Sequence, residues 1–436
     1  MGQGLLTGPA AADIEALLAD AGLERRDGSL VMAGVPLSTV ADAVGTPAYV
    51  YNTEAIGARY AELDRALAPV PHRICYAVKA NGNLAVLRVL RDLGAGADIV
   101  SAGELARALA AGFPAERIVF SGVGKSADEL RAAVNAGIGH INVESIEELE
   151  LLGAVVAGGR RTSVGIRVNP DVTTDTHPYI STSKSGIKFG IPTDQVLPAA
   201  RFIASHPQLE LTSIAMHLGS QLTDTAPFQE GIRRLLVLID QVRQAGITTL
   251  RVLDVGGGLG IRYGADAPMD PAAFAAAIIP LVTGTGLALY VEPGRFLVGS
   301  AGVLLASVLY RKHSGGKSFV IVDAGMNDLV RPSHYHAYHE IVELETAGRA
   351  VSRVDVVGPV CETGDFLALD RPLPALERGD RIAVLGAGAY GFVMASNYNA
   401  RRRPPEVIVQ GGRFAVARAR EEQDELFRGE HPTPLG

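Results

Sequence analysis

The feature that most constrains the fold is an alternation of short buried-strand patterns with amphipathic helical patterns between about residues 53 and 299. Segments such as 103–109 and 228–245 carry apolar residues at helical spacing. Strand–helix units joined by short loops predict an α/β fold, a closed TIM-type (β/α)8 barrel, with an open doubly wound sheet as the competing architecture. The expected strands are residues 73–80, 97–101, 117–122, 140–144, 163–169, 211–218, 250–256 and 288–292.

After about residue 300 the pattern changes to strands and turns without long helical stretches. The expected strands are residues 302–310, 318–323, 353–357, 381–385 and 407–409. Residues 29–51 are also strand-like and are expected to add a strand to this part. We therefore expect an N-terminal segment (residues 1–52) that partly joins a β domain, a barrel (residues 53–300), and a mainly antiparallel C-terminal β domain (residues 301–436).

The composition argues against several classes of protein. A formal net charge of −7 without a basic stripe argues against a nucleic-acid partner. No apolar run approaches the roughly 20 residues that span a bilayer, and residues 1–20 lack the pattern of a secretory signal. Cys75 and Cys361 are too few for a disulfide framework, so we expect a protein of the cytoplasm.

Ionisable, hydroxyl and glycine residues lie at or near the carboxyl ends of the expected barrel strands. In a barrel of this type the chemistry lies at the carboxyl ends of the strands, and stability alone does not explain so many costly groups at one rim. These residues are Lys79, Asp98, Ser101, Ser121, Glu144, Arg167, His217, Gly256, Gly257, Gly258, Glu292 and Arg295.

Lys79 ends the first expected barrel strand. An ammonium group beside a buried strand loses hydration that a partner must replace. Such a lysine either extends into solvent or forms a Schiff base with a carbonyl cofactor.

The glycine run 256–258 follows a strand, so its amides are candidates for a phosphate nest, with a tight turn as the alternative. It lacks the spacing of a dinucleotide-binding motif. Residues 122–126 end like a phosphate-binding P-loop, but Val119 stands where that motif needs its first glycine, so we reject this interpretation.

Other motifs also have two interpretations. Glu292 and Arg295 flank a turn and are candidates to bind a protonated ring nitrogen and an anion, or each other. His217 is either a core histidine or a ring that stacks on a flat cofactor, with Ser220 beside it. Cys361, next to Glu362, is either buried filler or a catalytic thiol. The spacing of three further histidines matches no common zinc site, so no metal is expected; they are His334, His336 and His339.

Taken together, the motifs resemble the alanine-racemase-like (fold type III) pyridoxal-phosphate decarboxylases over nearly the whole chain. The motifs are YAVKAN (76–81), HLGSQ (217–221), GGG (256–258), EPGR (292–295), RPSHY (331–335), CETGD (361–365) and GAYG (388–391). The segments HPYIST (177–182), KFG (188–190) and SNYN (396–399) are similar to the diaminopimelate branch of that family rather than the ornithine branch.

The resemblance implies pyridoxal 5'-phosphate as the cofactor, held by Lys79 through a Schiff base. It implies that His217 stacks on the pyridine ring and that Glu292 keeps the ring nitrogen protonated. The residues implied around the phosphate or beside it are Ser220, Gly256, Gly257, Gly258, Gly294, Arg295 and Tyr390. The resemblance implies that the substrate carboxylates or the wall of the site involve Arg295, Arg331, Tyr335 and Tyr390. It implies that Glu362 binds the distal amino group of the substrate.

The implied reaction is decarboxylation of meso-2,6-diaminopimelate to L-lysine, with Cys361 as the acid that protonates the α-carbon. The resemblance also implies a homodimer in which the partner contributes the Cys361 loop to a shared site. Two alternatives stay open: a decarboxylase of ornithine, lysine or carboxynorspermidine on the same fold, and a non-enzymatic single-barrel cofactor carrier. Arg331 argues against a substrate without a second carboxylate, and the β domain argues against the carrier.

Overall fold

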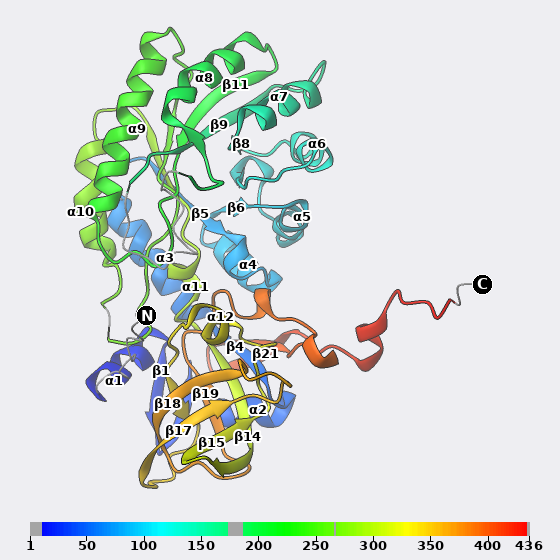
Figure 1. The fold of residues 1–436 in the computed structure, drawn as a ribbon. Helices are drawn as coiled ribbons and strands as arrows, with labels where there is room; N and C mark the ends of the chain where they lie inside the picture. The colour runs from blue at the N-terminus through cyan, green and yellow to red at the C-terminus, as the bar shows by residue number, and fades with distance from the viewer. Residues whose placement is uncertain (1–10, 173–185, 266, 434–436) are drawn as a thin grey trace. The chain divides into compact units, whose positions relative to one another are not determined.

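The computed structural model describes residues 11–172, 186–265 and 267–433. The chain divides into two compact units, shown in Figure 1. One unit comprises residues 56–261 and 267–297, and the other comprises residues 1–55, 262–266 and 298–436. The first is called the barrel unit below, and the second the β unit.

Within the described residues, the barrel unit is a closed parallel barrel. Each strand pairs with the next in the sequence, and the ring closes because β8 pairs with β9 and β13 pairs with β5. This closure confirms the expected barrel over the open sheet. Its strands are β5 (His72–Ala77), β6 (Gly96–Ile99), β7 (Ile118–Phe120), β8 (His140–Val143), β9 (Thr162–Asn169), β11 (Leu209–Ala215), β12 (Val252–Asp254) and β13 (Ala288–Val291), with β10 (Ile191–Pro192) added beside β9.

Helices follow the strands and form the outer layer around them (Figure 1). They are α3 (Thr53–Leu67), α4 (Leu84–Asp92), α5 (Ala102–Ala111), α6 (Ala127–Ala136), α7 (Ile146–Val155), α8 (Val196–Ser205), α9 (Ala226–Gln244) and α10 (Pro271–Val282), with the short α11 (Arg295–Val298) after β13.

Several of these helices begin at a serine directly after a strand-end loop. Ser126 forms a reciprocal capping box with Glu129, while the Ser101 and Ser145 hydroxyls accept hydrogen bonds from amides in the first turn of their helices. These caps fix where each βα loop ends. They therefore define the rim at which the strand-end side chains gather.

The β unit contains a mainly antiparallel sheet. As expected, the N-terminal part contributes a strand: β4 (Ala48–Asn52) lies between β14 (Gly302–Ser314), with antiparallel pairing, and β20 (Glu406–Gln410), with parallel pairing. The other strands are β15 (Lys317–Val322), β16 (Ile341–Glu343), β17 (Val351–Val357), β18 (Phe366–Pro374), β19 (Arg381–Val384) and β21 (Arg413–Arg418).

The first residues of the β unit cover its core. Leu17, Leu37 and Val50 are buried with Val303 and Val407 in one apolar cluster. The elements here are α1 (Ala11–Asp20), β1 (Leu23–Arg26), β2 (Ser29–Met32), β3 (Val35–Pro36) and α2 (Leu37–Val44). The strand-like interpretation of residues 29–51 is therefore wrong at α2, where Leu37, Val40 and Ala41 form one buried helical face.

In the described part of the chain, none of the helices combines the length and apolar character that a membrane crossing requires.

Candidate active site

Lys79 follows β5 and lies beside a buried acid. Its Nζ is 3.1 Å from Oδ2 of Asp98, whose side chain has no exposed surface. Asp98 comes from the neighbouring strand β6, where it is paired in register with Ala77. Lys79 itself is not on a strand, because β5 ends at Ala77 and residues 78–80 form one 3-10 turn. The predicted strand 73–80 is therefore three residues too long.

The turn that carries Lys79 packs against the loop after β13. The Ala77 amide donates to the carbonyl of Pro293 at 3.2 Å. A Cβ atom on Gly294 would come within 2.9 Å of the Cβ of Ala80. Gly294 is thus required by this close approach, which positions Lys79 relative to the Glu292 loop.

Glu292 and Asp254 form a buried carboxyl pair at the ends of adjacent strands. Burial, followed by the negative charges of Asp254 and Asp98, raises the pKa of Glu292 well above its ordinary range, while Lys79 lowers it. Burial also raises the pKa of Asp254 to about 6. The two carboxyl groups interact, so each affects the pKa of the other.

The glycine run after β12 is packed against two neighbouring loops. A Cβ atom on Gly257 would lie 2.1 Å from the carbonyl oxygen of Glu292, and one on Gly258 would lie 2.6 Å from that of Gly219. The Gly256 amide donates to Asp254 and the Gly257 amide donates to Nδ1 of His217, at 2.9 and 3.1 Å. The run therefore brings two strand ends together, and two of its three amides bind protein acceptors.

His217 is held as a neutral ring. Because its Nδ1 accepts the Gly257 amide, any proton on the ring lies on Nε2. Loss of hydration and the positive charges of Arg167 and Lys79 lower its pKa well below the ordinary value. A neutral, flat imidazole at this rim is suited to stacking on an aromatic ring.

Arg295 begins α11 and is almost fully buried. Its Nη2 donates to the Ser220 hydroxyl at 3.2 Å. A guanidinium and a hydroxyl group, both suited to binding an anion, therefore lie close together. Ser220 follows Gly219, whose carbonyl packs against Gly258 of the glycine run.

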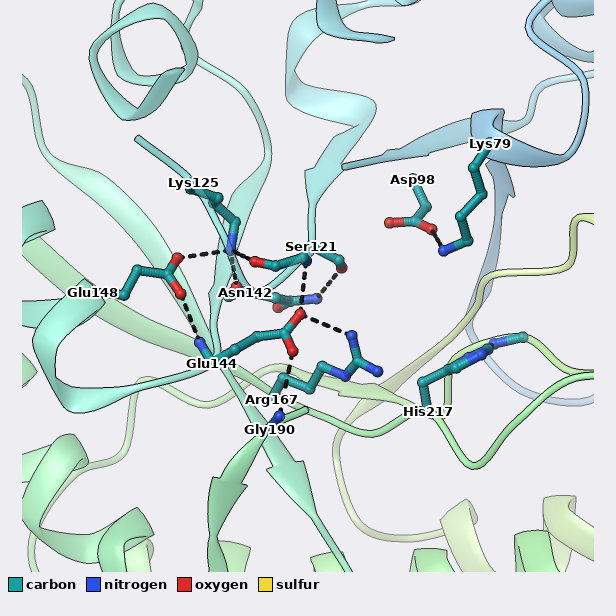
Figure 2. Close-up of polar contacts among 12 residues, drawn as sticks. Lys79, Asp98, Ser121, Lys125, Asn142, Glu144, Glu148, Arg167, Gly190 and His217 are labelled. Atoms are coloured by element: carbon teal, nitrogen blue, oxygen red, sulfur yellow. Dashed lines mark hydrogen bonds and ion pairs between the residues drawn. The ribbon is translucent and has the colours of Figure 1, made fainter. Parts of the chain in front are cut away.

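Arg167 belongs to a buried network that was not predicted as a unit (Figure 2). Its Nη1 donates to Oε1 of Glu144 at 2.8 Å, and the same oxygen accepts the Gly122 amide at 2.7 Å. The second oxygen of Glu144 accepts the Gly190 amide at 3.3 Å. Glu144 therefore joins three separate segments of the barrel rim.

Lys125 completes this network. Its ammonium group, with a side chain only 1% exposed, donates to Glu148 and to the carbonyls of Gly122 and Asn142, each at 2.7 Å. Glu148 in turn accepts the Glu144 amide at 3.0 Å. The lysine of the P-loop-like segment 122–126 is thus buried among protein acceptors (Figure 2).

The remaining predicted residues lie in the β unit. Arg331 is buried at the start of α12 (Arg331–Tyr335), donates to Nε2 of His339 at 3.3 Å, and lies over the ring of Tyr263. Nδ1 of His339 bonds to the Leu385 carbonyl. His339 therefore uses both ring nitrogens for protein contacts, and no group of three metal-binding side chains occurs among the described residues.

Cys361 and Glu362 lie on an exposed loop that follows β17, held by the SNYN segment. The Asn399 side chain accepts the Cys361 amide at 2.7 Å. A hydrogen bond from Tyr398 to Glu362 raises the pKa of this tyrosine.

Tyr390 has a left-handed backbone (φ +55°) after β19. The predicted segment HPYIST at residues 177–182 lies outside the described residues.

Sequence reasoning gave no role to Asp98, Arg167 or Glu144, although all three were recognised as strand-end residues. Asp254 was missed altogether, because the predicted strand 250–256 placed it inside a strand rather than at its end. Glu104 was also missed. Burial raises its pKa to about 7, and Asp98 adds to this shift.

Comparison with known proteins shows the family to which the chain belongs. Residues 53–299 match the family model described as pyridoxal-dependent decarboxylase, pyridoxal binding domain. The chain is 50% identical to the diaminopimelate decarboxylase of Pseudomonas aeruginosa, over 94% of this chain and 98% of that one, and 48% identical to that of Pseudomonas fluorescens, over 94% and 98%. The structure of diaminopimelate decarboxylase from Helicobacter pylori complexed with L-lysine superposes with a TM-score of 0.87 at 40% identity, covering 90% of this chain and 98% of that one. The chain therefore belongs to the diaminopimelate decarboxylase family of pyridoxal-dependent decarboxylases.

Proposed function

We propose that this protein decarboxylates meso-2,6-diaminopimelate to L-lysine and CO2, with pyridoxal 5'-phosphate as its cofactor. The observation that carries the proposal is the pairing of Lys79 with Asp98 on the same barrel rim as the buried acid Glu292. An amine to hold an aldehyde and an acid to hold a ring nitrogen are the two groups that this cofactor requires. The names of the relatives support the substrate.

The residues of the rim fit the cofactor. Among the described residues, the buried Oε1 of Glu292 and the buried Oδ1 of Asp98 have no hydrogen-bond partner. A buried carboxyl group of this kind is costly when charged, and a protonated ring nitrogen would compensate that cost.

Lys79 would hold the cofactor, and Asp98 would fix the direction of its amine. His217, neutral, would stack on the ring, and Glu292 would accept the N–H of the ring nitrogen. The phosphate would lie among Ser220, Gly258 and Arg295, with Gly256, Gly257, Gly294 and Tyr390 shaping the wall. When bound, the cofactor withdraws electrons from the substrate's α-carbon, which makes the loss of CO2 feasible.

The β-unit residues would bind and protonate the substrate. Arg331 would bind the carboxylate that is retained, with Tyr335 beside it, and Glu362 would bind the distal ammonium group. The Cys361 thiol would deliver a proton to the α-carbon after CO2 leaves. Asn399 and Tyr398 would keep the Cys361 loop in position through their contacts with Cys361 and Glu362.

The exposure of Cys361 and Glu362 in a single chain supports a homodimer in which each loop completes the partner's site. Light scattering would measure the dimer directly, and a monomer with full activity would contradict the shared site. Both cysteines are free thiols, which supports a cytoplasmic location.

The substrate is tested by assaying the purified holoenzyme against a panel of diamino acids. Release of CO2 and formation of L-lysine from meso-diaminopimelate, with little turnover of ornithine or lysine, is the expected result. Turnover of lysine or ornithine without turnover of diaminopimelate would favour the other decarboxylases of this fold. The variant Arg331→Gln should raise KM for diaminopimelate, because one carboxylate would lose its guanidinium partner.

A further inference from the structure

A cavity of about 420 Å³ opens at the amino ends of the barrel strands. Its lining includes the first residues of several strands, such as His140 of β8, Thr162 of β9 and Val252 of β12. Lys79, His217 and Glu292 follow the carboxyl ends of barrel strands, so the cavity lies at the opposite end of the barrel from the candidate active site. Its volume falls within the range of small-molecule sites.

The lining of this cavity is strongly basic. Four arginines, Arg73, Arg160, Arg161 and Arg251, face one glutamate, Glu116. Outside the lining, a single acid, Glu210, pairs with both Arg161 and Arg251, at 3.0 and 3.1 Å. The cavity therefore holds more positive charge than its neighbouring carboxylates neutralise.

Arg73 accounts for part of that excess. Its guanidinium lies 4.9 Å from the ring centroid of Tyr290 and makes a long contact of 3.4 Å to the Glu116 carbonyl. Among residues 11–172, 186–265 and 267–433, no carboxylate forms an ion pair with it. A half-buried guanidinium in this state is a ready partner for an external oxyanion.

His140 is the most buried ionisable residue that this cavity's lining shares with the barrel core. Only 5% of its surface is exposed, and its ring packs against Tyr290 with centroids 5.7 Å apart. Its Nε2 finds no hydrogen-bond partner in the described part of the chain. Burial and the charges of Arg73 and Arg251 lower its pKa to about 3, so the ring is neutral and can donate one hydrogen bond. Buried polar atoms are rarely left without a partner.

We propose that this cavity is a second binding site, distinct from the active site, for a small polyvalent oxyanion with carboxylate or phosphate groups. Arg73 and Arg251 would bind its oxygen atoms, and His140 would form part of the wall beside them. The Ser163 hydroxyl, which accepts a hydrogen bond from Arg251 at 3.2 Å and also lines the cavity, can donate its own proton to such an anion. The proposal does not depend on the substrate of the active site.

The test is isothermal titration of cofactor-loaded protein, dialysed free of excess cofactor, with inorganic phosphate and separately with citrate at low ionic strength. Loading keeps the phosphate-binding part of the active site filled. Saturable binding of one probe is expected, and whichever binds more tightly identifies phosphate or carboxylate as the preferred chemistry. No saturable heat from either probe up to ~10 mM would overturn the proposal.

Matched variants locate the site. Arg73→Gln and Arg251→Gln should each weaken binding about tenfold or more, since each removes a charge-assisted contact. Arg88→Gln, an equal change of charge on the exposed face of α4, should leave binding unchanged. Equal weakening by all three variants, or by none, would overturn the assignment. Turnover by each variant checks its folding, and if one of the two cavity variants fails to fold, the other carries the test.

Discussion

The Lys79 ammonium group lies 3.1 Å from the carboxylate of Asp98, a residue with no exposed surface, and Lys79 is also the cation that lowers the pKa of Glu292. The three residues come from β6 and from the loops after β5 and β13, so one lysine links three neighbouring strand ends. When Lys79 holds the cofactor, its positive charge is no longer that of a free ammonium. The negative charges of Asp98 and Glu292 are then compensated by the bound ring instead of by the ammonium group.

The first prediction concerns Lys79. Lys79→Ala should abolish the absorbance near ~420 nm that a lysine-linked cofactor shows, and should abolish turnover, because the covalent attachment is lost. Absorbance spectra of the dialysed proteins provide the measurement. Lys312→Ala, which removes an exposed lysine from β14, is the control and should keep the band. A normal spectrum in Lys79→Ala would mean that another lysine holds the cofactor.

The second prediction concerns the carboxyl pair. Because the pKa of Asp254 is raised in the folded protein, the fold retains a proton that the unfolded chain has released between about pH 4 and pH 6. The stability of the cofactor-free protein therefore loses a contribution on the order of 3 kcal/mol as the pH rises through this range. Asp254→Asn cannot ionise, so its Tm relative to wild type should increase from pH 4 to pH 7.

Thermal unfolding of cofactor-free protein measures this difference. Asp194→Asn, at an exposed aspartate of the same barrel unit, should show no comparable trend. Cofactor binding should flatten the pH dependence in wild type, because the ring nitrogen then compensates Glu292. A Tm difference that stays constant or falls with pH would contradict the raised pKa of Asp254.

The barrel was predictable because its strands are continuous apolar runs and its helices have amphipathic spacing. The helix predicted at residues 228–245 is α9, Ala226–Gln244, and the strand predicted at 163–169 is β9, Thr162–Asn169. A parallel strand in a barrel is buried on both faces, so it is a continuous apolar run that can be recognised from local sequence. The strand β18, Phe366–Pro374, was missed because Asp370, Arg371 and two prolines interrupt its pattern, and its pairing with β17 comes from tertiary structure.

The site was only partly predictable. Strand-end position identified Lys79, His217 and Glu292, because the carboxyl ends of parallel strands meet at one rim. The Asp254–Glu292 contact joins residues far apart in sequence, and no local pattern records which side chains touch. Likewise, the P-loop-like spacing around Lys125 gave no sign that this lysine would be buried against Glu148.

The third prediction concerns that buried ion pair. Lys125→Met leaves Glu148 buried without its cation, which should cost about 3–5 kcal/mol of stability. It should also weaken cofactor binding, since Glu148 holds the Glu144 amide and Glu144 holds Arg167. Because burial already raises the pKa of Glu148, the deficit should shrink as the pH is lowered and the acid becomes neutral.

Thermal unfolding and cofactor titration measure these two effects. The double variant Lys125→Met, Glu148→Gln removes the uncompensated charge and should recover much of the lost stability. If the single variant kept the wild-type Tm, the network would not be a structural support of the rim.

The last prediction concerns the loop that carries Cys361. Asn399 adopts a left-handed backbone (φ +56°) and accepts the Cys361 amide at 2.7 Å, so its side chain fixes the first residue of the CETGD motif. Asn399→Ala should lower kcat about tenfold by letting the thiol leave its position, while the cofactor band and its affinity stay unchanged. Asn399→Asp keeps an acceptor oxygen and tolerates the same backbone, so it should retain most of the activity. Cys361→Ala should slow turnover to a similar or greater extent with the cofactor still bound. Equal activity of Asn399→Ala and wild type would show that this hydrogen bond does not position the thiol.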